Sequence, residues 1–134
     1  MAAVERLKRR PEFLRVAGGR RKWVAPGLIL QALQQDSAAD GRAPARVGFT
    51  ASAKVGNAVL RNRARRRLRA AAAAVLPCHG APAHDYVLIA RAGTLNRQFA
   101  DLVADLVAGL RRLGLYREGA DADASRTAKE CHAA

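Results

Sequence analysis

Residues 58–75 form a segment that a single helix would divide into one apolar face and one strongly cationic face. At about 100° per residue, five apolar side chains fall within one narrow stripe: Leu60, Ala64, Leu68, Ala71 and Val75. Six of the nine residues from Arg61 to Arg69 are arginine, and most of them lie on the opposite arc. We therefore expect a helix that buries its apolar stripe against a sheet and leaves its guanidinium groups outside.

These arginines lower the stability of the free helix. Most lie in its first turns, where the helix dipole favours negative charge by roughly 0.3–1 kcal/mol per exposed group. Like charges four residues apart, such as Arg61 and Arg65, add a few tenths of a kcal/mol each, and the segment contains no acid to offset them. A bound polyanion explains this arrangement better than a solvated surface, which usually mixes both signs. Arginine also offers a planar fork for bidentate phosphate contacts.

The charge of the whole chain indicates the same kind of partner. Residues 1–69 hold 17 of the 24 Lys and Arg residues but only 4 of the 11 Asp and Glu residues, so the formal charge of +13 belongs to this half of the chain. Nucleic acid is the commonest polyanionic partner. No apolar stretch approaches the roughly 20 residues that span a bilayer, and the charged N-terminus lacks the apolar core of a secretion signal. We therefore expect a cytoplasmic protein with no membrane partner.

Two further helices are expected. Pro11 suits the first turn of a short helix over 10–17, and Gly18-Gly19 suits its end. Asn96 can cap a final helix that runs to Leu113, in which apolar residues recur at helical spacing. The arginine-bearing helix is expected to end before Pro77.

The apolar runs between these helices predict strands, near Val24 and over 28–33, 47–51 and 85–90. The last run is continuously apolar, which is typical of a central strand. Separate groups of strands and helices favour an α+β sandwich of two layers over a doubly wound sheet. Small polar residues from Glu118 onward predict a disordered tail, which leaves residues 1–117 as the folded domain.

The segment KVGNAVLRNRARRRLR (54–69) resembles the signature of the bacterial ribonuclease P protein component. Its matching residues are Lys54, Gly56, Asn57, Ala58, Val59, Arg61, Asn62, Arg63, Arg65, Arg66, Leu68 and Arg69. RLKRRPEFLRV, RVGFTAS, DYVLIAR and FADLVADLVAGLRRL resemble the opening, third strand, last strand and closing helix of that family, so the resemblance covers residues 6–113.

The resemblance implies an α-β-β-β-α-β-α two-layer sandwich with a left-handed βαβ crossover, similar to ribosomal protein S5 domain 2. It also implies a protein subunit that joins a catalytic RNA and helps it remove the 5′ leader from precursor tRNA. The RNA and its bound Mg²⁺ would carry out the chemistry. The resemblance therefore implies no catalytic residue, no metal site and no cofactor bound by the protein alone.

The resemblance also implies roles for particular residues. Six match the segment that contacts the catalytic RNA: Arg61, Asn62, Arg63, Arg65, Arg66 and Arg69. Four match the cleft that holds the single-stranded leader: Phe13, Lys54, Asn57 and Arg91. An unpaired base can stack on Phe13 for roughly 1–3 kcal/mol. A lone aromatic at helical spacing is, however, more often a core residue.

The chain departs from the family pattern at two positions. Ala17 replaces a second aromatic residue in the first helix, and Ala53 replaces a base just before the motif lysine. Both changes predict weaker leader contacts. Trp23 offers another stacking surface, although packing at the sheet edge is the favoured interpretation.

Other polar residues do not define a site. Cys78, His79 and His84 match no zinc-binding spacing, and a second group of ligands is missing from the sequence. Asp101 and Asp105 lie one turn apart on the last helix, where a solvated face is expected.

Composition alone equally fits a ribosomal protein or an RNA chaperone with no catalytic context. Only the motif within 46–71 and its flanks favours the ribonuclease P protein over these alternatives. A membrane-surface helix fits less well because the apolar stripe is mostly alanine. A helix-turn-helix DNA reader also fits poorly, since strands flank the basic helix.

Overall fold

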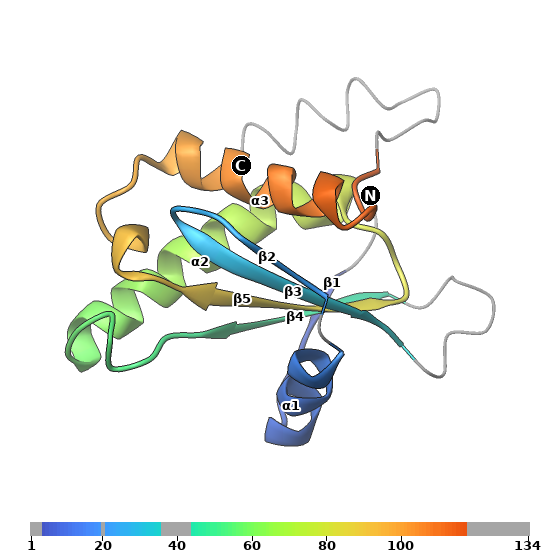
Figure 1. Ribbon diagram of the computed structural model, residues 1–134, viewed down its shortest axis with the longest axis horizontal. Helices are drawn as coiled ribbons and strands as arrows, with labels where there is room; N and C mark the ends of the chain where they lie inside the picture. Colours follow the sequence, from blue (N-terminus) through green and yellow to red (C-terminus); the bar gives the residue numbers. More distant parts are fainter. Residues whose placement is uncertain (1–3, 20, 36–43, 118–134) are drawn as a thin grey trace.

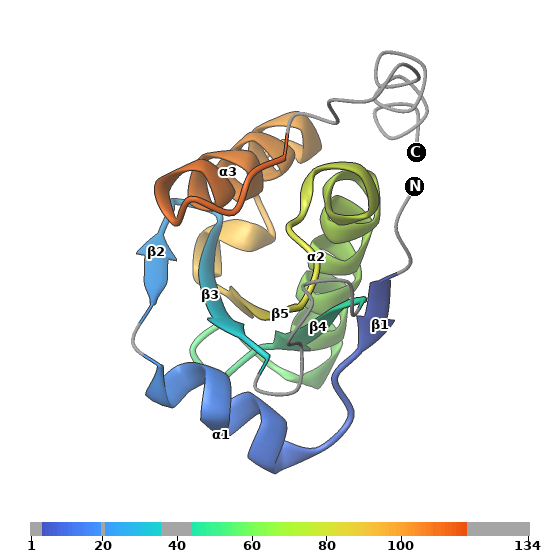
Figure 2. The ribbon, with the colours of Figure 1, turned by 90° about the vertical axis from the view of Figure 1, so that its right-hand side faces the viewer.

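The computed structural model describes residues 4–19, 21–35 and 44–117 of the chain. Its elements, in chain order, are β1 (Val4–Arg6), α1 (Arg10–Gly18), β2 (Lys22–Val24), β3 (Leu28–Gln34), β4 (Ala45–Thr50), α2 (Ala58–His79), β5 (His84–Ala90), η1 (Ala92–Thr94) and α3 (Phe99–Arg112). The strands form a five-stranded sheet in the order β1-β4-β5-β3-β2. Helices α2 and α3 cover one face of this sheet, and α1 lies against the other face (Figures 1 and 2). The expected α+β class is confirmed.

The connection between β4 and β5 defines the topology. These strands are parallel neighbours, with Val47 opposite Tyr86 and Phe49 opposite Leu88. The chain returns between them through α2, and β5 lies on the side of β4 that makes the crossover left-handed (Figures 1 and 2). Since right-handed crossovers dominate, the order of elements alone would have predicted the opposite hand.

The sequence prediction missed β1, so the element order begins with a strand rather than with α1. This strand pairs in parallel with β4, with Val4 opposite Ala45 and Arg6 opposite Val47. An edge strand of three residues, two of them charged, has no alternating apolar pattern to reveal it. Charged residues at an edge also discourage pairing with another chain.

Two predicted helix boundaries are wrong. Helix α2 continues through Pro77 to His79, because the burial of Leu76 and His79 outweighs the loss of one backbone hydrogen bond near the helix end. Helix α3 begins after Gln98, which occupies the N-cap position without a side-chain capping hydrogen bond, whereas the N–H of Asn96 donates to the Gly93 carbonyl, 3.2 Å away, in the turn that follows η1. The predicted loop at 36–43 and the predicted tail from Glu118 lie outside the described residues.

The apolar stripe of α2 forms the expected contact with the sheet. Ala64, Leu68, Ala71 and Val75 are completely buried, and Leu60 at the first turn is half-buried. They join one core cluster with side chains from the facing strands and from α3, namely Leu28, Leu30, Tyr86, Leu88, Leu102, Leu106 and Leu110. The cationic outer face of α2 is therefore supported by ordinary hydrophobic burial on its inner face.

A buried carboxylate attaches α1 to the other face of the sheet. Asp85 in β5 is fully buried and accepts two hydrogen bonds from Arg46 in β4, at 2.8 and 2.7 Å. It also accepts one from Arg15 of α1 at 3.2 Å, and Arg15 donates to the Gln34 carbonyl at 2.7 Å. The Asp85 carboxylate raises the pKa of Arg46. Charge-assisted hydrogen bonds to the Asp85 carboxylate thus join β5 to β4 and to α1.

Glu12 completes this attachment at the start of α1. Its carboxylate accepts hydrogen bonds from the backbone N–H groups of Arg9 and Lys8, and these bonds lower its pKa. Its other oxygen lies 2.5 Å from Arg46. Glu12 therefore caps the helix and connects it to the sheet.

Replacement of Asp85 by Asn should lower the free energy of unfolding by about 3 kcal/mol, the lower end of the range for a broken buried ion pair, because both arginines are partly exposed. Urea unfolding followed by circular dichroism measures this difference. Asp101→Asn, at an exposed position of α3, is the matched control and should leave stability nearly unchanged. Equal stability of the two variants would show that the ion pairs do not hold α1 in place.

Candidate nucleic-acid interface

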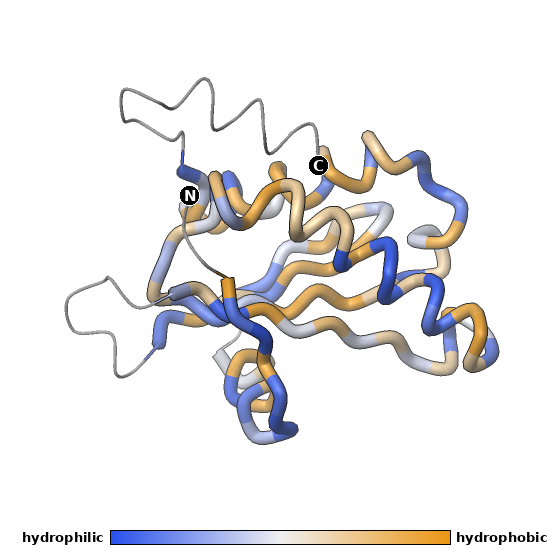
Figure 3. Tube along the Cα trace, turned by 180° about the vertical axis from the view of Figure 1, so that it is seen from behind, coloured by the Kyte–Doolittle hydropathy of each residue, from blue (hydrophilic) through white to orange (hydrophobic). Residues whose placement is uncertain are grey.

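The arginines of α2 project from the side of the helix that faces away from the sheet. Arg63, Arg66 and Arg69 are exposed, whereas Arg61 and Arg65 are half-buried. Seen from behind, hydrophilic segments recur along the N-terminal half of α2, and the alanine-rich half that follows is apolar (Figure 3). We call the side chains of Arg61, Asn62, Arg63, Arg65, Arg66 and Arg69 the arginine face.

Within the described parts of the chain, no arginine of α2 forms an ion pair with a carboxylate. Arg61 donates to the Gly56 carbonyl at 3.0 Å, and Arg65 donates to the side-chain oxygen of Asn62. These neutral acceptors orient the guanidinium groups but leave their charge in place. The arginine face is therefore a concentrated positive charge on a rigid helix, as phosphate binding requires.

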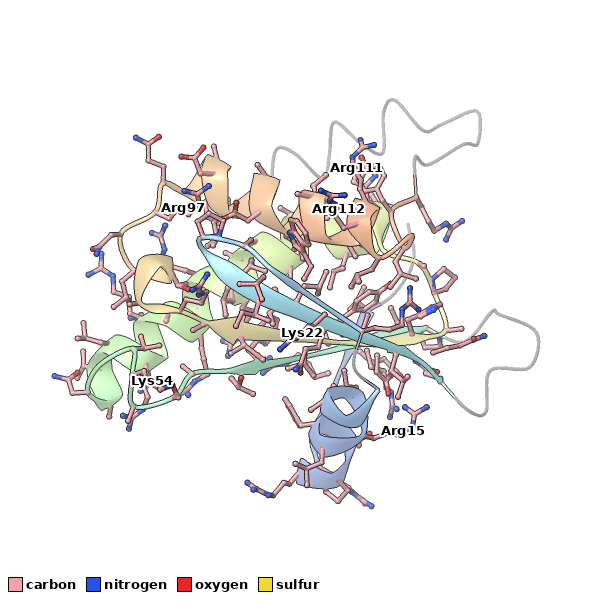
Figure 4. The ribbon with its side chains drawn as sticks, in the orientation of Figure 1. Arg15, Lys22, Lys54, Arg97, Arg111 and Arg112 are labelled. Carbon is pink, nitrogen blue, oxygen red and sulfur yellow. The ribbon has the colours of Figure 1, made fainter. Side chains whose placement is uncertain are left out.

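Arg67 differs from its neighbours on α2. It is half-buried and donates to the backbone carbonyl of Arg97, in the loop before α3. Arg97 in turn lies 2.5 Å from Asp105, which raises the pKa of Arg97 (Figure 4). Arg67 thus joins α2 to the α3 layer and does not belong to the arginine face.

Asp105 corrects a sequence prediction. It was expected on a solvated face with Asp101, but it is buried and accepts the backbone N–H of Gly27 at 3.0 Å as well as the Arg97 guanidinium. Only Asp101 is exposed. Helical spacing cannot reveal that the β2–β3 turn and the loop before α3 cover this part of the helix.

Phe13 lies on the α1 face of the sheet, in a small cluster with Leu7, Val16 and Val87. Its ring covers Gly48, where any side chain would collide with the ring. The ring is only half-buried, and it also borders a hollow of about 360 Å³ that is lined by Arg10, Phe13, Leu14, Phe49 and Thr50. Phe13 is therefore both a packing residue and an accessible aromatic surface.

The other predicted leader residues lie where the parallel strands β4 and β5 end. Lys54 and Asn57 follow β4, and Arg91 follows β5. Because these strands are parallel, both segments lie at the carboxyl-terminal ends of the strands, on the same side of the sheet. Lys54 is exposed beside the first turn of α2 (Figure 4). Asn57 caps α2 by accepting the N–H of Leu60 at 3.0 Å, and Arg91 donates to the Ala25 carbonyl at 2.7 Å.

The structure shows further residues near these positions that the sequence did not indicate. Arg10 and Thr50 border the same hollow as Phe13, and Leu14 beside them is 57% exposed. Arg10 was hidden among several charged residues of one segment, and Thr50 gave no signal because its position on the α1 face depends on the strand register.

Trp23 packs on the opposite face from Phe13. It pairs with Leu30 across β2 and β3, and a side chain added at Gly109 of α3 would approach its indole ring to 3.0 Å. The Arg112 guanidinium lies 5.0 Å from the ring centroid. Trp23 is therefore a packing residue at the sheet edge, as favoured, and it lies away from the Phe13 hollow.

The histidines have structural partners. His79 stacks on Tyr116 with 5.0 Å between ring centroids, and its Nδ1 lies 2.8 Å from the Arg117 carbonyl. The Nδ1 of His84 lies 2.8 Å from the Pro82 carbonyl. Among the described residues, no group of three His, Cys, Asp or Glu side chains has an arrangement suited to a metal ion. A helix long and apolar enough to cross a membrane is likewise missing from this part of the chain.

Fold and surface together define a small basic α+β protein that presents a rigid arginine face to a polyanion. The Ribonuclease P family model matches residues 1–114. The ribonuclease P protein component of Paramagnetospirillum magneticum is 54% identical over 134 residues, covering 95% of this chain and 96% of that protein. That of Gluconacetobacter diazotrophicus is 53% identical over 113 residues, covering 82% and 91%.

Solved structures show the same fold. The ribonuclease P protein of Staphylococcus aureus superposes with a TM-score of 0.68 at 21% identity, covering 84% of this chain and 97% of that one. The protein from Thermotoga maritima gives a TM-score of 0.60 at 19% identity, covering 78% and 93%. The chain belongs to the ribonuclease P protein family, and its function is that of the protein subunit of this bacterial ribonucleoprotein endoribonuclease. Family membership therefore decides against a ribosomal protein or an RNA chaperone, which composition alone would fit equally well.

Replacement of Arg66 by Ala should weaken binding to ribonuclease P RNA and make the plot of log K against log salt shallower by under one unit, since one phosphate contact is lost. Filter binding over a range of salt concentrations measures the slope. Arg117→Ala is the control, because Arg117 is exposed beyond the opposite end of α2. The same slope for Arg66→Ala and the wild type would mean that Arg66 contacts no phosphate.

Proposed function

We propose that the arginine face binds the catalytic RNA of ribonuclease P while the hollow beside Phe13 receives the single-stranded 5′ leader of precursor tRNA. The protein thereby positions the precursor for endonucleolytic removal of its leader. The observation that carries this proposal is the absence of internal ion pairs on the arginine face within the described chain. A charge that the protein leaves uncompensated is available to phosphates.

The placement of the acids supports a chemical step carried out by the RNA and its Mg²⁺ ions. Asp85 and Glu12 are engaged in holding α1, and Asp105 is engaged with Arg97. None of these carboxylates borders the hollow beside Phe13. The protein contributes positive charge and position, and both reduce the concentration of Mg²⁺ needed to bring two RNA molecules together.

The chemistry of the hollow suits an unpaired strand of any sequence. Phe13 offers an aromatic surface for a base, and Arg10 at the same hollow offers a charge for its phosphate. Lys54, Asn57 and Arg91 extend this polar track along the ends of β4 and β5, although Asn57 and Arg91 also make contacts within the protein. We place this activity in the cytoplasm, where precursor tRNA is made.

The direct test combines the protein with a bacterial ribonuclease P RNA and a precursor tRNA at low Mg²⁺. The rate of leader removal should rise, and the Mg²⁺ concentration at half-maximal rate should fall. Two controls are needed: the RNA alone, and the RNA with a triple variant of the protein that carries Arg63→Ala, Arg66→Ala and Arg69→Ala. A rate that does not respond to the wild-type protein would refute the proposed role.

Phe13→Ala should weaken binding of leader-bearing precursor to the assembled ribonucleoprotein by roughly 1–3 kcal/mol, since one base loses its stacking surface. Affinity for mature tRNA should not change. Phe99→Ala, at a partly exposed aromatic of α3, is the matched control and should affect neither ligand. Equal losses for precursor and mature tRNA would instead indicate that Phe13 acts only in packing.

A further inference from the structure

A second hollow lies on the α2 face of the sheet, between the edge strand β1 and α2. Its volume is about 210 Å³. Val47 and Phe49 of β4 form the floor, and Ala72 and Ala73 of α2 form one wall. We call this hollow the β1–α2 groove.

Two cations border this apolar groove. Arg6 reaches it from β1, with its guanidinium carbon 5.4 Å from the centroid of the Phe49 ring, and Arg69 reaches it from α2. No acid is among the described residues that line the groove, since Glu5 of β1 borders a different hollow, together with Glu12 and Arg46. The groove therefore combines an aromatic floor with two arginines at its rim, neither of which forms an ion pair within the described chain.

This combination matches the chemistry of a single unpaired nucleotide. A planar base gains from apolar and aromatic contact, and its flanking phosphates gain from arginine forks. An apolar peptide would gain nothing from the two arginines at the rim. A phosphate alone would gain nothing from the apolar floor.

The β1–α2 groove is continuous with the arginine face. Arg69 lies one helical turn after Arg65, so the two side chains lie on the same side of α2. An RNA strand that follows the arginine face toward the C-terminal end of α2 therefore reaches the groove at Arg69. The Cα trace in Figure 3 shows a hydrophilic segment at β1 and hydrophilic segments in the N-terminal half of α2.

We propose that the β1–α2 groove binds an unpaired base of the RNA that lies on the arginine face, with the adjacent phosphates held by Arg6 and Arg69. This inference rests on the proposed function and adds a base-binding site to it. Phe49 supplies the aromatic surface for the base. Arg6 and Arg69 are the only polar side chains among the described residues that line the groove, and the proposal assigns them to phosphates, so the groove selects for an unpaired base and not for its identity.

Ala73→Leu tests the proposal by filling the groove. Ala73 is exposed and helical, so leucine is compatible with α2. Affinity for ribonuclease P RNA should fall roughly 5- to 150-fold, the range expected for one displaced base, with no change in the salt slope. Ala104→Leu, which adds the same bulk at an exposed position of α3, should bind like the wild type.

A second pair of variants tests the phosphate contacts of the two arginines separately from the filling of the groove. Arg6→Gln and Arg69→Gln should each make the salt slope shallower by under one unit. Thermal melts of every variant verify folding. Wild-type affinity for Ala73→Leu, or an unchanged salt slope for both arginine variants, would overturn the groove proposal. Failure of the wild-type protein to bind the RNA would instead overturn the proposed function.

Discussion

The mutual repulsion of the arginines on α2 is the constraint on which the rest of the structure depends. The helix tolerates this repulsion because its inner face, including Leu68 and Val75, is completely buried against the sheet. Hydrophobic burial fixes the helix, and within the described chain no carboxylate forms an ion pair with the arginine face, so its charge stays available. The free protein is thus folded around a surface whose electrostatic energy falls only when phosphates approach.

Three acids of the described chain form ion pairs that hold its elements together, and none of these pairs includes the arginine face. Asp85 and Glu12 hold α1 against the sheet through Arg46, and Asp105 holds the loop before α3 through Arg97. Each of these three carboxylates is thereby committed to a fixed structural contact. Because α1 carries Phe13, the ion pairs on this face of the sheet determine the shape of the hollow beside Phe13, while the arginine face on the α2 side forms no ion pair within the described chain.

Strand β4 connects these two surfaces. Its alternating side chains direct Arg46 and Gly48 toward α1, and Val47 and Phe49 toward α2. Gly48 makes room for the ring of Phe13 on one face, and Phe49 forms the aromatic floor of the β1–α2 groove on the other while also bordering the hollow beside Phe13. A shift of one residue in the register of β4 would exchange these roles and abolish both surfaces.

The sequence by itself determined the amphipathic arginine helix, the main strands and the family, because helical periodicity, continuous apolar runs and the motif at 54–69 are local signals. The assignment of Phe13 to a leader cleft came from the family resemblance and stays a prediction. Only the tertiary structure decided that Asp105 is buried and that α2 passes through Pro77. These outcomes depend on contacts between segments far apart in the chain. For the same physical reason, the edge strand β1 and the groove beside it became visible only when parallel pairing with β4 brought Arg6 to Phe49.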